Sequence, residues 1–344
     1  MVLAHVEGAP AGMKGVSLFL LPRRLGDGSH NHYRIIRLKD KMGTRSMASG
    51  EIRLEGAIAY LVGEQGRGFV QMADMVNNSR LSNGVRAAGL MRRACAEAEY
   101  IASERRAFGK RLADMPLMQK QLQKLRLPAE QARTMVFQTA QALMRSDGGE
   151  VAAYPLLRIL TPLIKFRACR DARKVTGDAM EVRGGCGYIE EWSDPRLVRD
   201  AHLGSIWEGT SNIVALDVIR AVTRENSLPA LQAHFGALLD DAPLAPAFAK
   251  ALREALDRAC ALAANASAAA KDGDVIARQA ASALYHTCSA IAMAWEGARA
   301  GSVQRVEWAQ LVLLHRVLPR NPLAPSGIPA DWTLPAPTEA AIAA

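Results

Sequence analysis

The sequence predicts a mainly α-helical fold, in which a four-helix bundle follows a partial β-sheet domain and precedes a helical extension. Three observations predict it. Short apolar or alternating runs bounded by glycines occupy residues 1–68 and are typical of strands. Apolar residues recur at helical spacing in long stretches over residues 69–224, with short connections. A second set of helical patterns, rich in alanine, occupies residues 225–320.

Strand patterns are clear at three places in the first segment. GVSLFLLP (residues 15–22) is an apolar run between glycine and proline. YRIIRLK (33–39) and GEIRLEG (50–56) alternate apolar and charged residues, which predicts half-buried strands. About four strands are few for a self-contained sheet, so residues 1–68 are expected to be part of a domain.

The bundle is expected to contain four helices. The first begins near Phe69, and the second follows Pro116. The third covers about residues 152–182 and stops at the Gly184-Gly185 pair, and the fourth covers about residues 212–224.

The extension shows the same helical spacing. Apolar residues recur every three or four positions in two series: Leu252, Leu256, Cys260, Ala263 and Ile276, Ala280, Leu284, Cys288, Ile291, Trp295. Residues 321–344 contain five prolines and almost no charge, so this Pro-rich tail is expected to be extended and poorly ordered.

The composition indicates a globular protein whose first two thirds are basic. Its residues are 49% hydrophobic and 22% charged, which excludes a disordered chain, a collagen and a disulfide scaffold. The aromatic fraction of 5% argues against a stacking surface for single-stranded nucleic acid. Residues 1–224 hold 34 Lys and Arg against 23 Asp and Glu, a net charge of +11, and residues 225–344 hold 9 against 11, a net charge of −2. The basic part would attract nucleic acid, an anionic membrane or a small polyanion.

The five cysteines favour a reduced, cytoplasmic setting. Their number is odd and none forms a C-x-x-C pair, so no metal site or disulfide is predicted. No apolar run reaches the ~18 residues of a membrane span. The run Val16–Leu21 is expected to be a strand rather than a signal peptide.

Three stretches carry the most specific motifs: GEQGRGF at residues 63–69, SERRAFGKRL at 103–112 and GGCGYIEEWSDPRLVRDAHLGSIWEGTSN at 184–212. Together they resemble the C-terminal half of the acyl-CoA dehydrogenase family, over roughly residues 10–224. The resemblance narrows to the AidB-like branch, whose members carry a helical domain after the bundle. It implies the family's C-terminal four-helix bundle, an FAD cofactor, an acyl-CoA substrate and a homotetramer. The electron acceptor is left open.

The resemblance places the catalytic base at Glu208, which would remove the α-proton of an acyl-CoA thioester. A carboxylate in a dry pocket has a raised pKa and can act as a base near neutral pH. Trp207 beside it would help to exclude water. The alternative interpretation is an ordinary loop carboxylate before Gly209.

The resemblance also assigns cofactor contacts. Arg105 and Phe108 match positions that touch the flavin dinucleotide of a neighbouring subunit, and an Arg fork suits a pyrophosphate. The alternative is that Arg105 belongs to a solvated helix end. Gly184 and Gly185 would allow close backbone approach to the adenosine half. Glu181 stands where classical members have Gln, which puts that contact in doubt.

Three more positions have two interpretations each. Thr210 and Asn212 match flavin-contacting positions, or they cap the next helix. Arg80 matches a substrate-lining position near the base, or it forms an ion pair on its helix. Ser79 stands where some branches of the family have their catalytic Glu.

One basic run falls on the third helix: Lys165, Arg167, Arg170, Arg173, Lys174. It is expected to be a solvated helix face, and a phosphate-binding patch for DNA is the alternative. An AidB-like flavoprotein associated with DNA in the alkylation response is accordingly the alternative function.

Other segments of the family are absent. The first helical domain, the first half of the sheet domain and the flavin-gripping T-E-P-x-x-G-S-D segment have no counterpart in the sequence. The chain is therefore expected to be truncated at its N-terminus and to bind flavin weakly or not at all.

Overall fold

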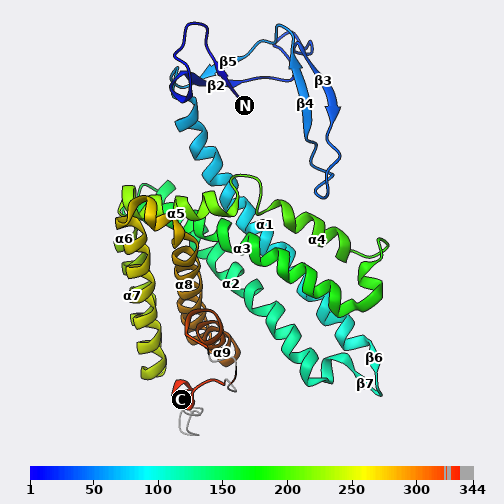
Figure 1. Ribbon diagram of the computed structural model, residues 1–344, viewed down its shortest axis with the longest axis vertical. Coiled ribbons are helices and arrows are strands. Elements are labelled where there is room, and N and C mark those ends of the chain that lie inside the picture. Colours follow the sequence, from blue (N-terminus) through cyan, green and yellow to red (C-terminus); the bar gives the residue numbers. More distant parts are fainter. Residues whose placement is uncertain (321–322, 324–326, 334–344) are drawn as a thin grey trace. The chain divides into compact units, whose positions relative to one another are not determined.

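The computed structural model describes residues 1–320, 323 and 327–333. The chain divides into two compact units, Met1–Ser79 and Arg80–Ala344. Helix α1 (Gly68–Glu104) contains the boundary between the units. The helices and strands are labelled in Figure 1.

The first unit contains two small antiparallel sheets. Strands β1 (Val2–His5), β2 (Val16–Leu20) and β5 (Tyr60–Val62) form one sheet in the order β1-β2-β5, with Leu18 opposite Leu3 and Val62. Strands β3 (Tyr33–Leu38) and β4 (Gly50–Leu54) form a two-stranded ribbon. The three predicted strands are confirmed as β2, β3 and β4, and β1 and β5 add two short ones.

The expected half-burial of β3 and β4 is wrong. Every β3 residue after Tyr33 is exposed, including Ile35 and Leu38, and Ile52 and Leu54 of β4 are also exposed. An alternating pattern predicts a buried face only when another layer covers it. The ribbon has two strands and no third one within the described residues.

The second unit begins with long helices that match the predicted bundle. After α1, a short hairpin of β6 (Arg106–Ala107) and β7 (Lys110–Arg111) leads to α2 (Pro116–Asp147). Helix α3 (Ala153–Arg183) ends where Gly184 adopts φ +72°, and α5 (Ser211–Glu225) is the predicted fourth helix. A further short helix, α4 (Asp194–Leu203), lies along α3 and was not predicted (Figure 1).

The extension is helical as predicted. It contains α6 (Ser227–Asp241), α7 (Pro246–Ala268), α8 (Ala277–Arg299) and α9 (Val303–Val312), and a π-helical turn follows at Leu313–Val317. Helix α8 packs against α2 and α5 as well as α7 and α9. Its buried face is rich in alanine, which lets neighbouring helices approach closely.

Two apolar cores hold the second unit together. One joins α1, α2, α3 and α4 through small side chains such as Ala94, Ala132 and Ala168. The other joins α2, α3 and α5 to the helices of the extension. The extension therefore shares a core with the bundle, and a domain boundary at residue 224 stays a prediction, like those at 68 and 320.

Part of the Pro-rich tail differs from the expected extended chain. Ala330–Trp332 form a 3-10 turn, and the Trp332 ring is buried against Phe248 at 5.1 Å between ring centroids. Gln310 donates to the Trp332 carbonyl at 2.7 Å. The prediction for residues 321–322, 324–326 and 334–344 lies outside the described residues. Within the described part of the chain, no helix combines the length and apolar character of a membrane span.

Candidate active site

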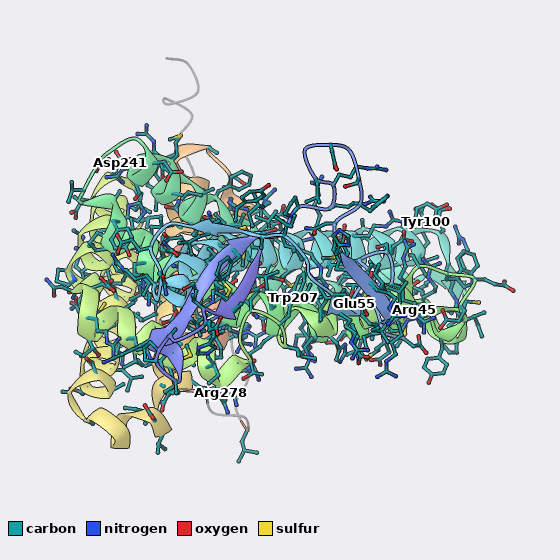
Figure 2. All side chains as sticks on the ribbon, turned by 90° about the horizontal axis from the view of Figure 1, so that it is seen from above. Arg45, Glu55, Tyr100, Trp207, Asp241 and Arg278 are labelled. Atoms are coloured by element: carbon teal, nitrogen blue, oxygen red, sulfur yellow. The ribbon has the colours of Figure 1, made fainter. Side chains whose placement is uncertain are left out.

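The predicted base lies on a short segment, Gly204–Gly209, that connects α4 to α5. The segment is turned rather than extended: the Ile206 and Trp207 amides both donate to the Leu203 carbonyl, at 2.9 and 3.2 Å. Figure 2 labels Trp207 on this segment. A turned segment between two helix ends can present a side chain without burying it.

Glu208 adopts an uncommon backbone conformation. Its φ is +54°, in the left-handed region that costs a residue with a Cβ about 1–2 kcal/mol. Gly209 follows with φ +103°, and a Cβ there would lie 3.2 Å from a methyl group of Val214. The glycine of the E-G-T motif is therefore required by both conformation and space.

The functional groups of Glu208 are available. The residue is half-buried, and within the described chain its carboxylate has no hydrogen-bond or ion-pair partner. Its backbone N–H likewise donates to no described residue. A carboxylate and an N–H that are both unengaged can act on an incoming molecule.

Two cations hold the backbone of this segment. The Lys165 ammonium donates to the Gly204 carbonyl at 2.6 Å and to the Gly209 carbonyl at 3.1 Å. The Arg80 Nε donates to the Glu208 carbonyl at 3.2 Å. Hydrogen bonds from charged donors are stronger than neutral ones, so they can stabilise the left-handed turn.

Arg80 is itself fixed by a carboxylate from α5. Its Nη1 lies 2.5 Å from an oxygen of Asp217, and Arg158 from α3 contacts the other oxygen at 2.9 Å. Burial acts to raise the pKa of Asp217, but the two arginines outweigh it and hold that pKa below its usual value. Arg80 thus forms an ion pair between helices rather than along its own helix, next to Glu208.

Trp207 is held in place by two residues of α1. Its indole N–H donates to the Asn83 side chain, and the Arg86 guanidinium lies 5.8 Å from the centre of its ring. Arg86 also donates to the Asp200 carbonyl at the end of α4. The ring beside Glu208 is therefore anchored to the bundle.

Thr210 and Asn212 follow Glu208 at the start of α5. Thr210 occupies the N-cap position, but its side chain makes no capping hydrogen bond. The Asn212 side chain accepts from Arg278 of α8 at 3.3 Å, and Arg278 is labelled in Figure 2. Thr210 is therefore the cap residue by position without the capping hydrogen bond, and the flavin-contact interpretation stays a prediction.

The other predicted cofactor residues form a second group at the far end of α1. The Arg105 Nη1 donates to the Arg183 carbonyl at 3.0 Å and lies 2.9 Å from the position of a Cβ on Gly184. Gly185 has open space around the same position. Phe108 forms the tip of the β6–β7 hairpin with φ +51° and is 97% exposed. Arg105 and Gly184 are thus brought together, and Phe108 lies on the hairpin that follows Arg105.

The two groups are well separated. Arg80 and Arg105 stand at either end of 24 residues of helix α1, which at 1.5 Å per residue is about 36 Å. An extended dinucleotide is much shorter than this. The two groups therefore lie at opposite ends of this stretch of α1 within one chain.

The basic run on α3 is not a solvated face, and that expectation is wrong. Lys165 is buried, Arg167 pairs with Asp171 and Arg170 is half-buried. Arg173 and Lys174 alone in the run are exposed. The five residues cover about two and a half turns, so their side chains point to different sides of the helix.

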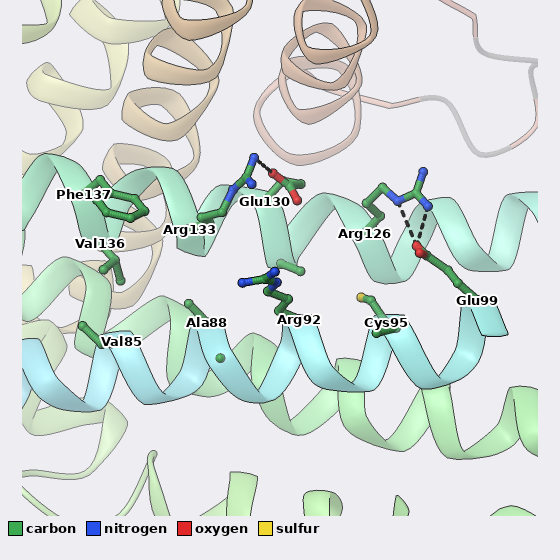
Figure 3. Close-up of a pocket in the computed structure, with 13 residues that line it drawn as sticks. Val85, Ala88, Arg92, Cys95, Glu99, Arg126, Glu130, Arg133, Val136 and Phe137 are labelled. Carbon is green, nitrogen blue, oxygen red and sulfur yellow. Dashed lines mark hydrogen bonds and ion pairs between the residues drawn. The ribbon is translucent and has the colours of Figure 1, made fainter.

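A pocket of about 410 Å³ lies between α1 and α2 and contains none of the predicted site residues. Figure 3 shows its floor of small side chains, including Ala88, and its rim of ion pairs, including Arg126 with Glu99. Val85 and Phe137 at one end are exposed.

Sequence reasoning missed Lys165, Asp217 and Asn83 as parts of the site. For Lys165 a signal was present, because it lies between Leu163, Ile164 and Phe166, whose side chains are all buried. A cation within an apolar helical run is expected to face a polar partner inside the protein. Asp217 and Asn83 carry no such signal.

Comparison with known proteins shows which family the chain resembles. Residues 66–223 match the family model of the acyl-CoA dehydrogenase C-terminal domain. The chain is 35% identical over 251 residues to acyl-CoA dehydrogenase family member 11 of Caenorhabditis elegans, covering 72% of this chain and 41% of that protein. It is 38% identical over 225 residues to the putative acyl-CoA dehydrogenase AidB of Escherichia coli K12, covering 65% of this chain and 40% of that protein.

A solved structure extends the likeness to the fold. The crystal structure of C. elegans ACDH-11 in complex with C11-CoA matches with a TM-score of 0.81 and 32% identity, over 87% of this chain and 52% of that one. The chain thus spans about two fifths of the length of these two curated relatives. On the motifs, the bundle and these matches, residues 66–223 form an acyl-CoA dehydrogenase C-terminal domain, and the chain is similar to AidB-like members of that family.

Proposed function

We propose that the protein is an FAD-dependent oxidoreductase that introduces an α,β double bond into an acyl-CoA thioester, with Glu208 as the base. The proposal rests on two features of Glu208: a carboxylate without a partner and a backbone that is held in place. Its carboxylate has no partner within the described chain, while its backbone is held by Arg80 and flanked by two carbonyls that Lys165 holds. A fixed, unpaired carboxylate is suited to take a proton from carbon.

The residues around Glu208 have separate roles in this proposal. The Glu208 carboxylate accepts the α-proton, and its unengaged N–H donates to the thioester carbonyl, where negative charge develops. Trp207, held by Asn83 and Arg86, limits the access of water. Arg80 lines the substrate side of the base. Bound FAD would supply the acceptor for the β-hydride, which leaves with the electron pair of its C–H bond.

The second group of residues fits the phosphates and adenosine of FAD. Arg105 uses Nη1 on the Arg183 carbonyl, and its Nε and Nη2 have no partner within the described chain. Gly185 leaves open space for a ligand to approach the backbone. Phe108 offers an exposed ring on the hairpin that follows Arg105. Thr210 and Asn212, beside the base, would contact the flavin end.

The function can be tested with the purified chain and FAD at a concentration that saturates even a weak site. We expect C11-CoA, the ligand in the ACDH-11 structure, to bleach the flavin absorbance without oxygen. Glu208→Gln should abolish the bleaching while FAD binding persists. Glu307→Gln is the matched control, because Glu307 is an exposed carboxylate on α9, outside the segment that carries Glu208. Bleaching that survives Glu208→Gln in the FAD-loaded chain contradicts the proposal.

We further propose that the protein acts as a homo-oligomer, a tetramer by family resemblance. The distance of about 36 Å between the two groups along α1 supports this, because each cofactor would then need residues from two chains. The exposed Phe108 and Phe137 side chains support it too. Light scattering on the purified chain tests the proposal, and a monomer at micromolar concentration would contradict it.

DNA association is the alternative function, and the net charge of +11 on residues 1–224 favours it. The α3 run contributes less to it than its sequence indicates, because Lys165 is buried and Arg167 is paired. Duplex DNA binding that weakens steeply with salt, without flavin bleaching, would support this alternative. A cytoplasmic location is also proposed, since all five cysteines are free.

A further inference from the structure

Lys165 carries a buried charge that forms no ion pair within the described residues. It lies in the middle of α3 and is 1% exposed, and within the described chain no carboxylate lies within ion-pair distance of its ammonium. Its two hydrogen bonds both go to backbone carbonyls, of Gly204 and Gly209. Burial lowers the pKa of Lys165, and the charges of Arg80 and Arg86 lower it further, whereas Cys169 and Glu208 oppose that shift.

Such an arrangement is costly if its only purpose is to fill space. A buried ammonium loses its hydration, and an apolar side chain of similar length would pack in the same place without that loss. The neighbours of Lys165 on α3, Leu163, Ile164 and Phe166, already fill the core. The two carbonyls that the ammonium holds therefore indicate what the charge does.

Those carbonyls bracket the base. Gly204 begins the turned segment and Gly209 ends it, with Trp207 and Glu208 between them. Because the Lys165 nitrogen binds the carbonyl at each end of the segment, it restrains the backbone between them. The left-handed φ of Glu208 needs such support, because that conformation is unfavourable for a residue with a Cβ.

We propose that Lys165 is a positioning residue, which holds Glu208 in its left-handed backbone conformation by binding the carbonyls of Gly204 and Gly209. Arg80 completes the restraint through the Glu208 carbonyl. Lys165 does not touch the substrate or take the proton. The inference rests on the proposed role of Glu208 for its importance to catalysis, but the restraint itself can be measured without catalysis.

The test compares Lys165→Met with Lys174→Met by amide hydrogen exchange on the full chain. Lys174 is an exposed lysine on the same helix that pairs with Asp178, so it controls for the loss of a charge from α3. In Lys165→Met, the Ser205, Ile206 and Trp207 amides should exchange about tenfold to a hundredfold faster, because two charge-assisted hydrogen bonds are lost. The Ile159 and Leu160 amides of α3 should keep their protection.

Uniformly faster exchange along α3 in Lys165→Met would mean a purely structural role and would overturn the proposal. So would unchanged exchange at 205–207. If Lys165→Met does not fold, the same exchange experiment is done on Lys165→Gln. The side-chain amide of that Gln can still donate to one of the two carbonyls. The expected result there is a smaller increase confined to the same segment, and no increase overturns the proposal.

A kinetic readout separates this inference from the proposed function. With FAD bound, Lys165→Met should lower the rate of flavin bleaching by C11-CoA about tenfold or more with little change in the concentration that half-saturates it. If Glu208→Gln leaves bleaching intact, the role of Glu208 fails while the exchange result still stands. If exchange at 205–207 does not change, the positioning role fails whatever Glu208 does.

Discussion

Arg80 of α1 and Asp217 of α5 form an ion pair at 2.5 Å, and the same guanidinium holds the carbonyl of Glu208. The pair therefore joins the middle of α5 to the segment that carries the proposed base. Arg158 from α3 shares Asp217, so three helices meet at one carboxylate. Both arginines and the aspartate are nearly buried, which makes their mutual neutralisation important for stability.

Replacement of Asp217 by Asn should destabilise the protein strongly. The variant keeps the shape of the side chain but leaves two nearly buried guanidinium groups without a counterion, at an expected loss of about 3 kcal/mol in the free energy of unfolding. Urea denaturation followed by circular dichroism measures the loss. Asp240→Asn is the control, because Asp240 pairs with Arg253 at an exposed site. Equal effects of the two substitutions would contradict the account.

The contribution of Asp217 should depend on pH in a defined direction. Its pKa is lowered in the folded protein, so the stability that its charge provides is fully present above the unfolded pKa of about 3.9. It is lost as the pH falls through the lower, folded pKa. The difference in unfolding free energy between the wild type and Asp217→Asn should thus be constant from pH 5 to 7, on the order of the loss given above, and shrink below about pH 4. A difference that grows on acidification would contradict the sign of this shift.

Gly209→Ala should destabilise the protein, and Gly236→Ala should not. At Gly209 the φ of +103° is strained for alanine and the added Cβ would lie 3.2 Å from Val214, so we expect a loss of about 1–3 kcal/mol in unfolding free energy. Gly236 lies inside α6 with open space at its Cβ position, and alanine there should stabilise the helix by about 0.5–1 kcal/mol. Thermal denaturation of both variants decides this, and a tolerated Gly209→Ala would show that the turn is not fixed as described.

Cys186 should be the one rapidly reacting thiol among the five cysteines, all of which lie in the described chain. It is exposed next to Gly185, whereas the other four are buried. Burial raises the pKa of Cys95 and Cys260 to about 12, which leaves almost no thiolate at neutral pH. Titration with a chromogenic disulfide should give one fast equivalent, absent in Cys186→Ser. Several fast thiols in the native protein would contradict the burial of the others.

The sequence predicts the helices well because their signals are local. Pro116 begins α2 and Gly184 ends α3, as the residues themselves require. The short helix α4 was missed because its ten residues offer too few turns for a periodic pattern. The exposure of Ile35 and Leu38 could not be foreseen either, since burial of a strand face depends on what covers it.

The site residues also divide into those that local sequence motifs identify and those that they do not. Motifs identify Glu208, Arg105 and the glycine pair, and the Arg80 guanidinium contacts the backbone carbonyl of Glu208. Its partner Asp217 lies 137 residues away, and no local pattern joins the two. Lys165 was misread because a run of cations was taken as one face, although consecutive helix positions point to different sides.

The central claim is that Glu208 removes the α-proton of an acyl-CoA. The most direct measurement is deuterium incorporation at the α-carbon of C11-CoA, incubated in D₂O with the FAD-loaded chain and followed by mass spectrometry. The account predicts incorporation by the wild type and by Glu307→Gln, and none above the protein-free background with Glu208→Gln. Incorporation by Glu208→Gln at the wild-type rate would contradict it.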